Sequence, residues 1–439
     1  MRKLTFKHAL TPDGIVADCV FGIDEAGLIA SVGHGGPPYD GDLALPGMPN
    51  AHSHAFQRAL AGRGERRAGD DSFWSWRDAM YSLAARVTPE QLYAIAAQAY
   101  VEMLAAGFTS VAEFHYLHHL PDGSATTAMA DAVIAAARDT GIRLRLLPVY
   151  YHAGGFGKPA GPGQRRFVHA SVDAYLAFVD SLDHPHKGFA PHSLRAVPLE
   201  HLREILRESQ TRSHNPLHIH ISEQEAEVQQ CMESHGARPI ELLADSLDLN
   251  AQWTLVHATH ADEGERTRIL ASGACVALCP LTEAYLGDGL FAAAAHHAAG
   301  GAWAIGSDSN GRIDAVEELR WLEYGQRLRD RRRARLADEN GIGLPLWRAA
   351  AAGGTQATGF PVGRLEAGCH ADLVVLSADA SPWRGLPPER WLDAWVTGGS
   401  RHDIDAVFVG GDRVVQAGRH RDGERISVDF AGALQELAR

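Results

Sequence analysis

The stretch LPGMPNAHSHAFQRAL, from Leu45 to Leu60, decides the fold because a short apolar run ends in two closely spaced histidines, His52 and His54. Two prolines and a glycine precede them, so a helix is disfavoured here. On a β-strand, residues two apart point to the same face, whereas on a helix they diverge by roughly 200°. The strand interpretation places two imidazole rings side by side. Such a pair is either half of a metal site or two unrelated polar residues, and the rest of the sequence has to decide.

Apolar runs of strand length recur after this one, with helix-like stretches between them. Together with the run at 45–52 they make eight candidate strands, and this alternation is typical of an α/β fold, the (β/α)8 barrel of the TIM type. In such barrels the active site lies at the carboxyl ends of the strands. The seven further runs are FTSVAEF (108–114), IRLRLLPVYY (142–151), KGFAPH (187–192), PLHIHIS (216–222), WTLVHA (253–258), CVALCP (275–280) and WAIGSD (303–308).

The two ends of the chain have a different pattern, in which short strands are joined by turns. We expect them to form one small composite β-sandwich domain, residues 1–46 plus 360–439, beside a barrel domain of residues 47–359. Two long segments follow barrel strands. Residues 61–80 are predicted to be a loop, and residues 152–166, rich in glycine and proline, are predicted to be a mobile lid or an irregular connector.

The composition is that of a globular enzyme and disfavours several other classes of protein. The chain has 439 residues, of which 45% are hydrophobic and 22% charged, and its net charge is −13. Nucleic-acid binders are usually basic, so we expect no nucleic-acid partner. No run approaches the ~18 apolar residues of a membrane span, and the first residues lack the apolar run of a signal peptide, so we expect no membrane partner. The five scattered cysteines predict a reduced, cytoplasmic protein without disulfides.

Polar residues at the ends of later strands can complete the metal site. An acidic residue that closes an apolar strand is costly to bury unless a cation or hydrogen bonds stabilise it, and Asp308 is such a residue. A histidine pair, a further histidine and an acid supply three nitrogens and one oxygen, which suits Zn²⁺ and leaves room for a water. The histidines and acids at these later strand ends are His218, His220, Glu223, His257, His260 and Asp308.

Four of these segments resemble the amidohydrolase superfamily, and the resemblance extends over nearly the whole chain. They are NAHSH in the first strand, HISE in the fifth, VHATH in the sixth and GSDSN in the eighth, and AGCHADLVVL resembles the C-terminal β domain. The metal ligands that the resemblance implies are His52, His54, His220 and Asp308. The catalytic residues that it implies are Glu223, His257 and Asp308. Structural roles are then expected for His218 and His260.

The lysines indicate how many metal ions this resemblance implies. Amidohydrolases with two metals commonly bridge them with a carboxylated lysine at the end of the fourth strand. The chain has four lysines, and Lys187 lies five residues before His192, roughly 16 Å from the catalytic end at ~3.3 Å per residue. No lysine is placed to bridge two metals. We therefore expect one divalent metal ion, most simply Zn²⁺, although iron and manganese can share this donor set.

These parts predict hydrolysis at an amidine-like carbon. A bound metal lowers the pKa of its water toward ~7, which supplies hydroxide at neutral pH. Asp308 can take the proton, Glu223 can deliver a proton to a nitrogen that leaves as ammonia, and His257 can stabilise the tetrahedral centre. The sequence thus predicts a metal-dependent deaminase or deiminase.

A second set of residues indicates the substrate. Arg77 lies in the aromatic segment SFWSWRDAMY, and Arg195 stands three residues after His192 in APHSLRAV. Two arginines at the mouth of an acidic protein suit a substrate with carboxylates, which guanidinium groups bind through two hydrogen bonds. These segments, with HSHAFQRALAGRGE, EFHYLHH and HISEQ, resemble the formimidoylglutamate deiminases, enzymes of histidine degradation. The substrate-binding residues that this resemblance implies are Gln57, Arg77, Tyr116, His192 and Arg195.

The resemblance implies that N-formimidoyl-L-glutamate and water are converted to N-formyl-L-glutamate and ammonia, by a protein that we expect to be a homodimer. One position departs from the pattern, because Tyr285 stands where similar sequences often have asparagine. Two alternatives stay open: a deaminase of the same fold that acts on a ring such as guanine, and a binding protein that has lost catalysis. The two arginines favour the dicarboxylate over the ring, and the acids and histidines at the strand ends favour an enzyme.

Overall fold

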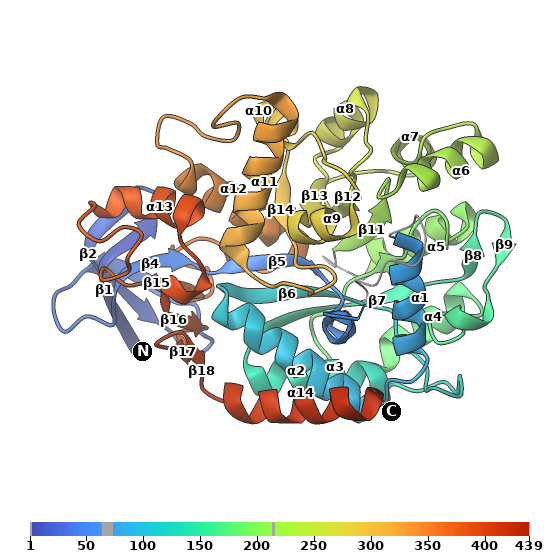
Figure 1. Cartoon of the computed structure of the whole chain (residues 1–439), viewed down its shortest axis with the longest axis horizontal. Helices are drawn as coiled ribbons and strands as arrows, with labels where there is room; N and C mark the ends of the chain where they lie inside the picture. Colours follow the sequence, from blue (N-terminus) through green and yellow to red (C-terminus); the bar gives the residue numbers. More distant parts are fainter. Residues whose placement is uncertain (1, 64–72, 213–215, 439) are drawn as a thin grey trace.

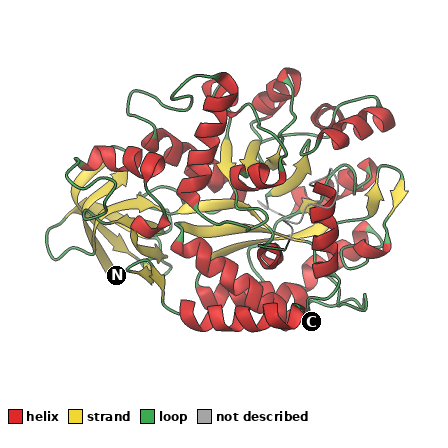
Figure 2. Cartoon of the chain, in the orientation of Figure 1, coloured by secondary structure: helices red, strands yellow, loops and turns green. Residues whose placement is uncertain are grey.

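A computed structural model of the chain describes residues 2–63, 73–212 and 216–438, and it places a barrel beside a smaller sheet formed by the two chain ends (Figure 1). Helices surround the barrel, whereas the smaller sheet lies to one side of it (Figure 2).

The barrel is built from eight parallel strands, as predicted. Pairing runs β5–β6–β7–β10 in one half and β11–β12–β13–β14 in the other. A bridge between Phe189 and Leu217 joins the halves on one side. A bridge between Ser53 and Asp308 closes the ring on the other. The strands are β5 (Met48–Ser53), β6 (Phe108–His115), β7 (Arg143–Tyr150), β10 (Ala190–Pro191), β11 (Leu217–Ile221), β12 (Trp253–His257), β13 (Cys275–Leu278) and β14 (Trp303–Ile305).

Helices follow the strands, and some of them begin at a residue that caps the helix. The Thr88 side chain accepts the backbone N–H of Gln91 at the start of α2, and Pro89 occupies the first turn. Asp262 caps α8 in the same way. The helices around the barrel are α2 (Pro89–Ala105), α3 (Ala128–Thr140), α4 (Val172–Ser181), α5 (Leu199–Thr211), α6 (Glu225–His235), α7 (Pro239–Ser246), α8 (Glu263–Ser272), α9 (Pro280–Leu286), α10 (Ala293–Ala298), α11 (Ala315–Asp330) and α12 (Gly343–Thr358).

Both chain ends contribute to the second sheet, in the order β18-β17-β16-β15-β4-β1-β2-β3. The sheet is mostly antiparallel, and β4 pairs with both β1 and β15, which joins the two ends of the chain. The Phe6 ring of β1 lies 6.1 Å from the rings of both Phe21 in β2 and Phe408 in β16. Because β4 and β15 lie between β1 and β16 in the sheet, the short distance to Phe408 indicates that the sheet curls on itself. The strands are β1 (Arg2–Thr11), β2 (Gly14–Ile23), β3 (Ile29–His34), β4 (Gly41–Pro46), β15 (Leu373–Leu376), β16 (Ile404–Val409), β17 (Asp412–Gln416) and β18 (Arg419–His420).

We propose that the domain boundaries fall as the sequence suggested, with a composite β-sandwich of residues 1–46 plus 360–439 and a barrel of residues 47–359. In support, β4 ends at Pro46 and α12 ends at Thr358, so both boundaries lie between elements.

Two segments that were predicted to be irregular contain regular structure. Helix α1 (Phe73–Ala84) replaces the loop predicted up to residue 80, because Trp76, Met80 and Leu83 recur at helical spacing and are buried. Residues 64–72 of the same segment lie outside the described part of the chain. The connector 152–166 forms the hairpin of β8 (Ala153–Gly155) and β9 (Lys158–Pro159), followed by the turn η2 (Pro162–Gln164). The remaining short turns are η1 (Ala55–Leu60), η3 (Pro388–Arg390) and η4 (Arg401–Asp403).

The C-terminal segment contains two helices in addition to the predicted strands. They are α13 (Trp391–Gly398) and α14 (Gly423–Leu437), and α14 lies along the barrel helices in Figure 1. Gln91 of α2 donates to Glu436 at 3.0 Å, and Arg63 donates to the Leu434 carbonyl at 3.1 Å. The last helix of the C-terminal segment therefore packs on the barrel.

None of the helices in the described ranges is both long enough and apolar enough to cross a membrane.

Candidate active site

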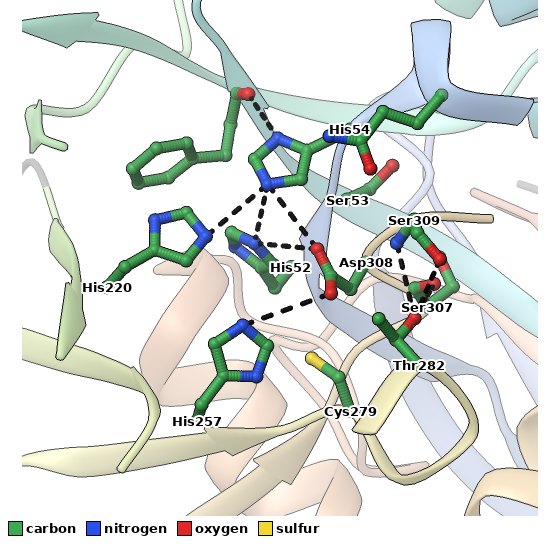
Figure 3. Close-up of polar contacts among 12 residues, drawn as sticks. His52, Ser53, His54, His220, His257, Cys279, Thr282, Ser307, Asp308 and Ser309 are labelled. Atoms are coloured by element: carbon green, nitrogen blue, oxygen red, sulfur yellow. Dashed lines mark hydrogen bonds and ion pairs between the residues drawn. The ribbon is translucent and has the colours of Figure 1, made fainter. Parts of the chain in front are cut away.

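Three histidines and one aspartate converge at the carboxyl ends of the barrel strands (Figure 3). His52 lies in β5 with His54 directly after it, His220 lies in β11, and Asp308 follows β14. Nε2 of His54 lies 3.1 Å from Nε2 of His52 and 3.4 Å from Nε2 of His220. Oδ1 of Asp308 lies 3.4 Å from Nε2 of both His52 and His54. All four ligand atoms lie within 4.8 Å of one another, and all four residues are buried.

Hydrogen bonds behind two of the rings leave their Nε2 atoms as acceptors. Nδ1 of His54 donates to the Phe114 carbonyl at 2.9 Å, and Nδ1 of His220 lies 3.3 Å from the His192 carbonyl. A ring that donates through Nδ1 keeps a lone pair on Nε2. Such lone pairs, facing each other at 3.4 Å, repel unless a cation lies between them. The four residues therefore fit a divalent metal.

Backbone bonds between the first and last strands hold the ligands in place. The Asp308 N–H donates to the His52 carbonyl at 3.0 Å, and the Asp308 carbonyl accepts from the His54 N–H at 2.9 Å. Asp308 has a φ of 44° and His257 a φ of 67°, in the left-handed region that costs a non-glycine residue about 1–3 kcal/mol. The packing of the barrel holds both residues in this strained conformation. The left-handed backbone turns the chain at the strand ends, so that both side chains point toward the cluster of histidines (Figure 3).

Burial and neighbouring charges set the protonation states that a metal requires. Burial lowers the pKa of His52 to about 3 and lowers the pKa of His220 well below its usual value. Burial opposes ionisation of Asp308, but the hydrogen bond from His52 and the charges of His257 and the other histidines hold its pKa below the usual range. Neutral imidazoles and an ionised carboxylate are the forms that bind metals.

His257 lies between two carboxylates. Its Nε2 lies 3.9 Å from Oδ2 of Asp308, and its Nδ1 lies 3.3 Å from Oε1 of Glu283. Burial disfavours the imidazolium, but the hydrogen bond with Glu283 and the charges of Glu223 and Asp308 raise the pKa of His257 to about 10. His257 can thus present positive charge to an oxygen that becomes negative during a reaction.

Glu223 is held at the pocket wall by Glu227, which binds its backbone N–H, and by Arg195, which lies near its carboxylate. The carboxylate of Glu227 accepts the N–H groups of Ser222 and Glu223, each at 3.2 Å. Nη2 of Arg195 lies 3.8 Å from Oε2 of Glu223. Burial raises the pKa of Glu223 against the opposing charges of His257 and Arg195. The protonated carboxyl that this favours can donate to a leaving nitrogen.

The residues implied to bind substrate line the same pocket as Glu223, His257 and Asp308. Gln57 donates to the Tyr116 hydroxyl at 2.7 Å, and both are buried. The structure thus brings together all five, which are Gln57, Arg77, Tyr116, His192 and Arg195.

Sequence reasoning missed several residues of this pocket. Tyr151 closes the third strand run, so the strand-end rule could have found it. Glu283 does not line the pocket but supports His257 from behind, and it follows the seventh strand in the same way. Tyr81 lies in the unpredicted helix α1, and Gln164 lies in the connector after the third strand, so neither carried a signal.

The remaining candidates lie elsewhere. Nε2 of His218 donates to the Ala357 carbonyl of α12 at 2.8 Å, and the His260 carbonyl accepts from Arg238. The Lys187 amine donates to backbone carbonyls, away from the ligands. Tyr285 is 42% exposed and lines a different cavity, so its departure from the similar sequences does not touch this pocket.

A second group of potential ligands, His257, Cys279 and Asp308, overlaps the first. Burial raises the pKa of the Cys279 thiol well above its usual value, which keeps it protonated. A protonated thiol is a poor ligand, so the three histidines with Asp308 are the better donor set.

Metal content tests this donor set. We expect purified protein to hold one divalent metal ion per chain by elemental analysis. His220→Asn should lose most of that metal because one of four ligands is removed, whereas His260→Asn should retain it because that ring lies outside the set. Two metal ions per chain, or full metal in His220→Asn, would contradict the assignment.

Comparison with known proteins agrees with this geometry. Residues 43–414 match the sequence model of the amidohydrolase family. The chain is 44% identical to the formimidoylglutamate deiminase of Pseudomonas aeruginosa, over 100% of both chains. The crystal structure of an amidohydrolase from Brucella melitensis superposes with a TM-score of 0.93 at 41% identity, over 100% of both chains. A zinc-bound adenosine deaminase from Xanthomonas campestris has the same fold, with a TM-score of 0.83 at 22% identity over 99% of this chain and 98% of that chain.

Proposed function

This chain belongs to the amidohydrolase family, and we propose that it hydrolyses N-formimidoyl-L-glutamate to N-formyl-L-glutamate and ammonia. The similarity to a formimidoylglutamate deiminase over the full chain supports a hydrolytic deiminase. The observation that carries the choice of substrate is that Arg77 and Arg195 line the pocket that ends at the four-ligand centre. A substrate with two carboxylates needs such cations in a protein of net charge −13.

The proposed resident metal is one Zn²⁺ ion, held by His52, His54, His220 and Asp308. Three neutral imidazoles and a carboxylate suit zinc, and the fourfold set leaves space for a water. When bound, the metal would polarise the attacking water and make its deprotonation favourable near neutral pH.

The protein's own side chains then move the protons. Water oxygen bonds to the formimidoyl carbon, and the proposed base for the water proton is Asp308, whose carboxylate is ionised. Glu223 is the proposed acid, which protonates the terminal nitrogen as its double bond to carbon opens. Both water protons reach that nitrogen by way of Asp308 and Glu223, so that the carbon–nitrogen bond breaks, the formyl carbonyl forms, ammonia leaves and both carboxyl groups return to their starting states. His257 is proposed to stabilise the negative charge on the oxygen of the tetrahedral centre.

Substrate selection is the clearest test of the proposal. Metal-replete protein is expected to release one ammonia per N-formimidoyl-L-glutamate consumed, with N-formyl-L-glutamate as the other product. Guanine tests the ring-deaminase alternative under the same conditions. Ammonia release from guanine at a higher kcat/KM than from formimidoyl-glutamate would overturn the proposal.

Three further proposals accompany this function. We propose a place in histidine degradation, because the family resemblance implies that pathway. We propose a cytoplasmic location, because the cysteines are all buried and form no disulfide. We also propose that the protein is a homodimer. Light scattering after gel filtration tests the dimer, and a mass of one chain would contradict it.

A further inference from the structure

Three residues at one wall of the pocket form a hydrogen-bonded group that the proposed mechanism does not use. They are Tyr81 of α1, Tyr151 just after β7, and Gln164 of η2, and all three line the same pocket as the two arginines. Tyr151 and Gln164 are each 8% exposed. We call Tyr81 and Tyr151 the tyrosine pair.

The orientation of the Gln164 amide follows from its partners. The Gly161 N–H donates to Oε1 of Gln164 at 2.8 Å, which identifies that atom as the oxygen. The amide nitrogen therefore faces the tyrosine pair, and it donates to the Tyr151 hydroxyl at 2.6 Å and to the Tyr81 hydroxyl at 3.3 Å.

Both hydroxyl oxygens of the tyrosine pair accept a hydrogen bond from Gln164. A side-chain hydrogen bond also joins the two tyrosines, and because it raises the pKa of Tyr151, the Tyr151 hydroxyl is its donor. Burial raises the pKa of Tyr151 well above its usual value, so its hydroxyl keeps the proton that it donates. Among the described contacts this leaves the Tyr81 hydroxyl hydrogen, so the pair can offer one hydrogen-bond donor to a ligand.

The surroundings of the pair favour an anionic ligand. Cζ of Arg77 lies 5.6 Å from the Tyr81 ring centroid, and the His192 ring lies 4.6 Å from the Tyr151 ring. Arg195 lines the same pocket. The two oxygens of a carboxylate can accept about four hydrogen bonds, whereas one arginine donates only two of them. A carboxylate bound to one arginine can therefore still accept hydrogen bonds from other donors.

We propose that the tyrosine pair, oriented by Gln164, binds one carboxylate of the substrate and so helps to select a dicarboxylate. The inference rests on the proposed function and extends it to residues outside the set implied by the family resemblance. Tyr81 is the substrate-binding residue of the pair in this proposal, and Tyr151 supports it by donating to its hydroxyl oxygen. Gln164 is a positioning residue, because it acts by orienting the two hydroxyls.

Removing one hydroxyl at a time tests the tyrosine pair. A hydrogen bond to a charged group contributes enough that Tyr81→Phe should lower kcat/KM for formimidoyl-glutamate about 10- to 100-fold, mainly through KM. Tyr151→Phe should lower kcat/KM less, because it removes only the hydrogen bond that supports the Tyr81 hydroxyl. Tyr93→Phe is the matched control, because it removes a hydroxyl that bonds Asp139 outside the pocket. Metal content and Tm should stay at the parent values.

An isosteric change at Gln164 tests its positioning role. Gln164→Glu keeps the acceptor for the Gly161 N–H, but its second oxygen accepts from the tyrosine hydroxyls and turns the Tyr81 hydrogen away from the substrate. We expect Gln164→Glu to raise KM more than Gln164→Met does, with kcat changed less than threefold. In a Tyr81→Phe, Tyr151→Phe background, the effect of Gln164→Glu should shrink at least fivefold, because the hydroxyls it reorients are gone.

The outcomes separate this inference from the proposed function. A parent protein that does not hydrolyse formimidoyl-glutamate would refute the function itself. An active parent whose tyrosine variants behave like Tyr93→Phe would refute the carboxylate site alone. Equal effects of Gln164→Glu in the parent and in the double-phenylalanine background would refute the positioning role.

Discussion

Replacing Glu223 with glutamine is expected to lower kcat by about 10²-fold or more while the metal content stays near that of the parent. The amide has nearly the same shape but cannot deliver the proton that ammonia needs in order to leave. Glu223 is absent from the four-ligand set, so its loss should not release the metal. Steady-state ammonia release and elemental analysis on the same preparation check both halves of this prediction.

A neighbouring glutamate provides the control for this variant. Glu225 is exposed in the first turn of α6, so Glu225→Gln changes the same functional group outside the pocket and should leave kcat within about twofold. Loss of metal in Glu223→Gln would mean that a ligand has been misassigned. Unchanged kcat in Glu223→Gln would remove Glu223 from the proton transfer.

Replacing either Arg77 or Arg195 with methionine is expected to lower kcat/KM for formimidoyl-glutamate about 30- to 1,000-fold. Arginine binds a carboxylate through two charge-assisted hydrogen bonds, and losing such a pair in a partly desolvated pocket costs roughly 2–4 kcal/mol of transition-state binding. Methionine keeps much of the apolar stem, so the fold and the metal should remain. Kinetics over a range of substrate concentrations, together with Tm and metal content, check this.

Substrate analogues separate charge recognition from general damage. Arg203→Met removes an exposed arginine from α5 and should leave kcat/KM within about twofold. The parent should hydrolyse formimidoyl-glycine, which has one carboxylate, far more slowly than formimidoyl-glutamate. If it hydrolyses both equally well, the two arginines do not select a dicarboxylate, and the ring-deaminase alternative regains support.

Local sequence patterns were sufficient for the architecture and for the position of the site. Alternating apolar runs and helix-like stretches predicted the eight-stranded barrel, because parallel strands buried on both faces need continuous apolar residues. The same strand geometry predicted that His52 and His54 share a face, and the structure brings them to His220 and Asp308. Strand ends meet at one edge of a barrel, so the histidines and acids at the strand ends could be placed together, and the resemblance to the amidohydrolases then singled out these four.

The sequence by itself therefore determined the barrel, the sheet shared by both chain ends, and the strand ends that carry the chemistry. Only the tertiary structure decided which residues complete the pocket and which support its side chains. Gln164 reaches Tyr81, 83 residues away, and Glu283 reaches His257, 26 residues away. Only the tertiary structure shows that α14 packs against α2 of the barrel. Periodicity reports which face of an element is buried, but a hydrogen bond depends on the position and direction of two groups, and these are set only when the elements pack.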